Sequence, residues 1–129
     1  MRSGLMASLV FAVVMAGVAG AQAAEDVLAS GTFAGASGHK TSGGVAVVRT
    51  DAGAMVVLQE DFSLDGAPDP KVGFGRDGAY DKSSQLAPLG ANKGHQTYQL
   101  PASVDPAKYN EVYIWCERFS VPLGVAKLQ

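Results

Sequence analysis

The sequence has little cysteine and no excess of positive charge. Its single cysteine, Cys116, cannot form an internal disulfide bond. Ten Lys and Arg residues stand against twelve Asp and Glu residues, and no basic cluster is present, so we do not expect nucleic acid as a partner. After the N-terminal region, no apolar run is long enough to span a bilayer. The free thiol is therefore the most distinctive chemical group of the chain.

The N-terminus has the three parts of a secretory signal peptide. Arg2 supplies positive charge, residues 5–18 form an apolar run, and residues 21–23 read A-x-A. The run is shorter than the roughly 20 residues of a membrane-spanning helix. We expect a cleaved signal peptide over residues 1–23, no membrane span after cleavage, and a periplasmic or secreted domain over residues 24–129. A domain of this size buries a core without disulfide bonds.

Glycine and short β-branched runs indicate strands joined by turns. The chain has sixteen glycines and six prolines and no long helical pattern. The clearest signal is a hairpin, in which residues 44–50 and 54–59 flank Asp51-Ala52-Gly53. We therefore expect an all-β fold, an antiparallel β-sandwich or a barrel-like single domain. The other expected strands cover residues 31–34, 71–75 and 96–100, and two more follow Tyr109.

Near the C-terminus, one set of apolar residues lies at even-numbered positions and the next set lies at odd-numbered positions. Alternate side chains of a strand share a face, so each set would line the core from its own strand. The alternation must then slip at Glu117-Arg118, through a bulge or a tight turn, which places Cys116 at a strand end and more accessible than in mid-strand. Trp115 points away from Cys116 and is assigned to packing. The two sets are Val112, Ile114 and Cys116, and then Phe119, Val121, Leu123 and Val125.

The residues leave three interpretations of Cys116 open. It is a reactive or ligating thiol, a buried and inert small hydrophobe, or one half of an intermolecular disulfide. Arg118 would favour the thiolate form and Glu117 would oppose it. The oligomeric state is left open with them.

A glycine motif at residues 73–78 matches G-x-G-x-x-G, the pattern of dinucleotide-binding sites. The motif fails on context, because no amphipathic helix follows it and no acidic residue lies about twenty positions on. We interpret it as a glycine-rich turn.

Metal and hydrolase patterns are also incomplete. The chain has the residue types of a blue-copper centre in His39, His95, Cys116 and Met55, but in the wrong order, and it lacks C-x-x-C-H. Its central aspartates have no EF-hand spacing and are interpreted as turn caps. No ordered catalytic triad is present. We expect no metal site, and an electron-transfer or binding module rather than a classical enzyme.

The C-terminal part of the chain reads W-C-x-x-F-S-V-x-x-G-x-A-x-L from Trp115 onward. Together with less specific stretches, this motif makes most of the chain after the signal peptide similar to the DM-thirteen electron-transfer domain family. The less specific stretches are residues 31–33, His39 with residues 42–46, and residues 58–62, 68–72, 86–89, 94–101 and 109–114.

The resemblance implies a β-sandwich-like fold with the cysteine at position 116 as redox centre. Cys116 would act as a free thiol or as a ligand to a prosthetic group such as haem, and the identity of any cofactor is left open. His39 matches a family histidine and is a second candidate for cofactor binding. A redox partner protein is implied as well. The alternative function is a non-catalytic extracytoplasmic binding or adhesion module in which Cys116 is inert.

Overall fold

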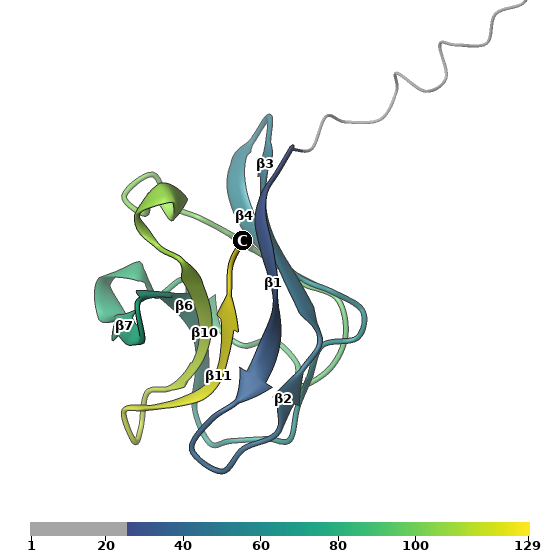
Figure 1. The fold of residues 1–129 in the computed structure, drawn as a ribbon, viewed down its shortest axis with the longest axis vertical. Helices are drawn as coiled ribbons and strands as arrows, with labels where there is room; N and C mark the ends of the chain where they lie inside the picture. The colour runs from purple at the N-terminus through teal and green to yellow at the C-terminus, as the bar shows by residue number, and fades with distance from the viewer. Residues whose placement is uncertain (1–25) are drawn as a thin grey trace, which may run out of the picture.

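The computed structural model describes residues 26–129, and the expected signal peptide lies outside the described residues. Nine antiparallel strands form one curled sheet, a half-barrel with the order β7-β6-β10-β11-β1-β3-β4-β9 and with β8 added to β6 (Figure 1). The predicted all-β, barrel-like fold is confirmed. The strands of this sheet are β1 (Asp26–Gly35), β3 (Gly44–Thr50), β4 (Gly53–Leu58), β6 (Pro70–Arg76), β7 (Ala79–Asp81), β8 (Ala87–Pro88), β9 (Gln96–Gln99), β10 (Glu111–Cys116) and β11 (Val121–Lys127).

Two short strands and two 3-10 helices lie outside the large sheet. Strands β2 (Thr41–Ser42) and β5 (Ser63–Leu64) pair with each other, and the 3-10 helices η1 (Lys82–Ser84) and η2 (Pro106–Lys108) lie in connections. The Thr41 hydroxyl donates a 2.7 Å hydrogen bond to the Leu123 carbonyl and so fastens β2 to β11. Asp105 caps η2, and its side chain accepts a hydrogen bond from the Ala107 amide at 3.0 Å.

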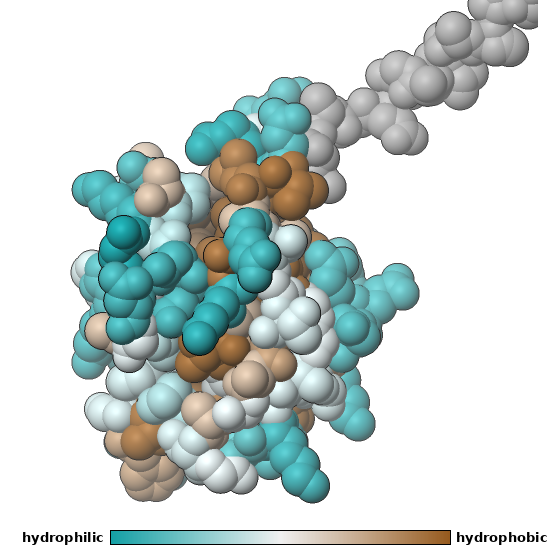
Figure 2. Space-filling view, in the orientation of Figure 1, coloured by the Kyte–Doolittle hydropathy of each residue, from teal (hydrophilic) through white to brown (hydrophobic). Residues whose placement is uncertain are grey.

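The first strand is longer than its sequence pattern predicts. We expected residues 31–34, whereas β1 has ten residues. Its first part pairs with β3 and its last three residues pair with β11, so β1 joins the two halves of the sheet. Val27 and Leu28 remain exposed, and Figure 2 shows hydrophobic atoms gathered beside the start of this strand. Exposed apolar side chains hide the period-2 pattern by which a half-buried strand is recognised.

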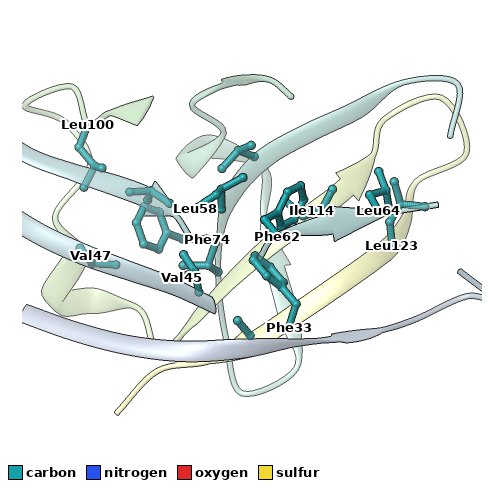
Figure 3. Packing of buried hydrophobic residues seen from close by; sticks show 14 of the residues in the cluster. Phe33, Val45, Val47, Leu58, Phe62, Leu64, Phe74, Leu100, Ile114 and Leu123 are labelled. Atoms are coloured by element: carbon teal, nitrogen blue, oxygen red, sulfur yellow. The ribbon is translucent and has the colours of Figure 1, made fainter. Parts of the chain in front are cut away.

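The core fills the concave side of the sheet. Phe33 and Phe62 meet edge to face with ring centroids 5.5 Å apart, and large side chains from β4, β6, β10 and β11 surround them (Figure 3). Burying side chains of this size contributes about 1.5–3 kcal/mol each. The largest fully buried members of this layer are Leu58, Phe62, Leu64, Phe74, Ile114 and Leu123.

The glycine motif at residues 73–78 covers the end of strand β6 and the turn that follows it, and its last glycine has the turn position that the sequence predicts. Gly78 has a φ of +89° and turns the chain between β6 and β7. A Cβ at Gly73 would collide with the Tyr80 ring, and a Cβ at Gly75 would collide with the Tyr113 ring. Two of the three glycines therefore make room for aromatic rings on the convex face.

The tight turn expected at Glu117-Arg118 is present, and a second irregularity lies inside the hairpin that it closes. The register of β10 and β11 shifts between Ile114 and Trp115, so that Leu123 and Gly124 are both buried. Residues 117–120 form a turn. Phe119 is 62% exposed in that turn, and its assignment to the core is wrong. The bulge breaks the alternation inside β11, so Val125 pairs with Tyr113 and lies outside the core cluster, and its assignment to the core face is wrong as well.

Between residues 26 and 129, the structure contains no helix with the length and hydrophobicity needed to cross a membrane.

Candidate functional site

Cys116 is the last residue of β10 and lies in the core. Its backbone pairs with Pro70 of β6 on one side and with Val121 of β11 on the other. Its side chain points to the concave face with those of Val112 and Ile114, and the residue is only 1% exposed. The thiol is free. The strand-end position is confirmed, and the expected accessibility is wrong.

A segment without a clear sequence signal is attached to β6 and contributes to the core. The amide of Leu86 donates to the Val72 carbonyl at 2.8 Å, and the amide of Leu89 donates to the Pro70 carbonyl at 2.9 Å. The short strand β8 is thereby held on β6, and Leu86 and Leu89 pack against the cluster that contains Cys116. Leu86 and Leu89 therefore add to the apolar cluster of which Cys116 is a member.

The charges beside Cys116 form a small network on the convex face. Glu117 lies 3.7 Å from the Lys71 ammonium and 3.9 Å from that of Lys82, and Asp69 lies 3.3 Å from Lys71. The Glu117 amide also donates to the Asp69 carbonyl at 3.0 Å. The negative charge next to the thiol is therefore paired with two lysines, and Arg118 is exposed in the turn.

His39 lies in the connection between β1 and β2, on the rim of an open hollow of about 810 Å³. Its Nδ1 is 2.9 Å from Asp65 Oδ1, and the Lys40 amide donates to Asp65 Oδ2 at 3.0 Å. A carboxylate on one ring nitrogen fixes the tautomer and leaves Nε2 to bind or accept. The Asp65–His39 pair thus has the arrangement that supports a ligating histidine.

The two predicted site residues occupy different environments. Cys116 is part of the closed core, whereas His39 borders an open hollow that Cys116 does not line. His95, the other histidine, is exposed. The structure pairs His39 with Asp65 rather than with the thiol, and the functional assignment of Cys116 and His39 stays a prediction.

A third group of side chains escaped the sequence analysis. On the convex face, Tyr80 of β7 stacks on Trp115 of β10, with ring centroids 4.3 Å apart and planes at 12°. Tyr113 lies 5.4 Å from Tyr80 and 6.4 Å from Trp115. We call Tyr80, Tyr113 and Trp115 the aromatic cluster. Trp115 packs on the face opposite to Cys116, as predicted. The sequence signal for the cluster was the spacing of Tyr113 and Trp115, which lie two positions apart in one strand and therefore share a face.

One family model matches nearly all of the described fold. Its description is Electron transfer DM13, and the match covers residues 32–128, from β1 to the end of β11. The chain belongs to this family. No curated protein and no solved structure gives a significant match. The expected resemblance is confirmed, and the matched range of the DM13 domain contains His39, Cys116 and the aromatic cluster.

Haem ligation by Cys116 does not fit the packing of this DM13 domain. A haem bonded through the sulfur needs an open pocket at that atom, and Cys116 lies in one cluster with the fully buried Leu64, Ile114 and Leu123. Proteins pack such interiors closely, so the group would have to displace core side chains. We therefore derive no step through haem.

The Asp65–His39 pair predicts a dependence of stability on acid pH. The Lys40 amide and then the His39 ring hold the pKa of Asp65 below its ordinary value. A carboxylate whose folded pKa is depressed stabilises the fold above its unfolded pKa, and this contribution disappears as pH falls through the folded value. In the wild type, the melting temperature is expected to fall as the pH drops below about 4, the range where unperturbed aspartates titrate. We expect this fall to be smaller in Asp65→Asn.

Asp26, whose side chain has no hydrogen bond or ion pair within residues 26–129, provides the matched control. Asp26→Asn is expected to leave the acid limb of the melting profile unchanged. A profile of Asp65→Asn that follows the wild type at every pH would contradict the role of this pair.

Proposed function

We propose that this DM13 domain transfers single electrons outside the cytoplasm and that Cys116 is the group that is oxidised and reduced. The observation that carries the proposal is the family match over residues 32–128, which places the chain's single cysteine in an electron-transfer domain. The signal peptide expected over residues 1–23 supports export to the periplasm or beyond. A redox protein with a one-electron centre is the partner that this function requires.

The burial of Cys116 favours electron transfer over thiol–disulfide exchange. Exchange requires a thiolate and a disulfide sulfur to meet, and a residue that is 1% exposed does not allow that contact. An electron can cross a thin layer of packed protein without such contact. In the proposed step, the Cys116 thiol gives one electron to the oxidised centre of the partner and loses one proton to the solvent, and it becomes a thiyl radical. The reverse step restores the thiol.

A second function also draws support from the burial. Free cysteines with apolar neighbours behave as small hydrophobes and are chemically inert. In that case the domain is a non-catalytic extracytoplasmic module for binding or adhesion, and Cys116 is one of its core residues.

Absorption spectra and voltammetry of the exported protein separate these functions. Electron transfer at Cys116 predicts a reversible one-electron wave in the wild type that is lost in Cys116→Ala. An absorption band in the visible range that disappears in this variant would show a ligated cofactor instead. A colourless protein whose voltammogram is the same with and without the thiol would contradict the proposal. The function as a binding or adhesion module would then be the supported one. The intact mass of the same sample checks cleavage after Ala23.

A further inference from the structure

The aromatic cluster has the geometry of a path for electrons on the face opposite to Cys116. Tyr80 and Trp115 are half-buried and stack nearly in parallel, and Tyr113 beneath them is buried. Tyrosine and tryptophan are the side chains that lose one electron most readily after cysteine. Because tunnelling weakens steeply with distance, rings in contact exchange an electron far more readily than separated ones.

Tyr113 also has an acceptor for its proton. Its hydroxyl donates to Glu111 Oε1 at 3.3 Å, and Glu111 is 5% exposed. The Gly78 amide donates to both oxygens of this carboxylate, at 2.9 and 3.1 Å, and fixes it in place. Burial, and then the charge of Glu111, raise the pKa of Tyr113 to about 12, so the phenol keeps its proton at neutral pH. An oxidised phenol is a strong acid, and a neighbouring carboxylate takes its proton.

We propose that the aromatic cluster is a one-electron relay in which Tyr113, with Glu111 as its proton acceptor, is a redox site separate from Cys116. The inference rests on the proposed electron-transfer function, but it does not require oxidation of the thiol. It gives Trp115 a task beyond packing, namely the transfer of charge between the surface and a buried phenol.

The relay step balances in electrons and protons. A high-potential one-electron acceptor removes one electron from Trp115. Tyr113 supplies one electron to the oxidised indole, and its phenolic proton moves along the hydrogen bond to the Glu111 carboxylate. The result is intact Trp115, a neutral Tyr113 radical and a protonated Glu111. A one-electron donor then reduces Tyr113, which takes the proton back.

The chain offers a matched control for this site. Tyr109 also donates to a carboxylate, Asp81 Oδ2, at 2.6 Å. Its ring stacks on Phe74, at 5.3 Å between centroids, and within residues 26–129 it contacts no other tyrosine or tryptophan ring. Phenylalanine does not carry a hole at these potentials. Tyr109 is therefore a phenol–carboxylate pair without the indole relay.

Photochemical oxidation with ruthenium(II) tris-bipyridine and persulfate tests the relay. Samples of the full domain are frozen during illumination and examined by electron paramagnetic resonance. We expect a neutral tyrosyl signal in the wild type and in Cys116→Ala, loss of that signal in Tyr113→Phe, and its retention in Tyr109→Phe. The signal in Cys116→Ala distinguishes failure of the thiol proposal from failure of the relay.

Two further variants test the parts of the path. Glu111→Gln removes the proton acceptor and is expected to abolish the neutral radical, and Trp115→Phe keeps an aromatic ring and is expected to slow its formation. Circular dichroism checks that each variant folds. A tyrosyl signal that survives in Tyr113→Phe, or that is lost in Tyr109→Phe, would overturn the relay. An unchanged signal in Glu111→Gln would overturn the role of the carboxylate.

Discussion

Cys116 is expected to react with a thiol reagent at least about a thousandfold more slowly in the folded protein than in denaturant. The residue is 1% exposed, so the reagent reaches the sulfur only when the domain opens. A small domain with a stability of about 5 kcal/mol spends less than one part in a thousand of its time unfolded. Labelling with a maleimide, followed by mass spectrometry with and without denaturant, measures the ratio.

A cysteine two positions further along the chain provides the control. Arg118 is exposed in the turn, so Arg118→Cys in a Cys116→Ala background is expected to label at nearly the same rate in both conditions. Fast native labelling of Cys116, close to that of this variant, would show that the end of β10 opens locally. It would then restore thiol exchange as a mechanism for the domain.

Gly43→Ala is expected to lower the free energy of unfolding by about 3 kcal/mol, because two costs add. Gly43 has a φ of +97°, a backbone conformation that a residue with a Cβ adopts only under strain. The new methyl group would also collide with the backbone of Asp61 and Phe62, which cannot move aside as a flexible side chain does. Urea denaturation of the variant and the wild type gives the difference.

Gly38→Ala separates the two costs. Gly38 has a similar φ of +81°, and nothing lies within 4 Å of the position that its Cβ would take. Its substitution is expected to cost about 1 kcal/mol, the strain of the left-handed conformation alone. Equal losses at Gly38 and Gly43 would show that the segment of Asp61 and Phe62 moves to accommodate the methyl group.

The strands with clear alternation could be predicted, and those whose pattern depends on their neighbours could not. The hairpin of β3 and β4 follows directly from two β-branched runs and an Asp/Gly loop. The short strands β7 and β8 lie in the segment of residues 76–93, which looks irregular because three or fewer residues carry no period. The N-terminal half of β1 was missed because its apolar side chains face solvent.

The sequence allowed us to predict which residue is the candidate site, but not the surroundings of that residue in the fold. The sequence identifies Cys116 as the single thiol and places it at a strand end, whereas its burial depends on the side chains that several other strands bring into one apolar cluster with it. The aromatic cluster depends on pairing of β6, β7 and β10, which brings Tyr80 to residues more than thirty positions away. Such contacts are set by sheet order, which the period-2 pattern does not encode.

The position of β1 has a consequence for how the domain acquires its structure. The first strand pairs with the last one, β11, and is the link through which the two halves of the half-barrel share one sheet. During synthesis β11 is made last, so the edge of β1 stays without a partner until the chain is nearly complete. Long-range pairing of this kind makes folding slow and leaves strand edges open to association. We expect the domain to fold only after its whole sequence is available.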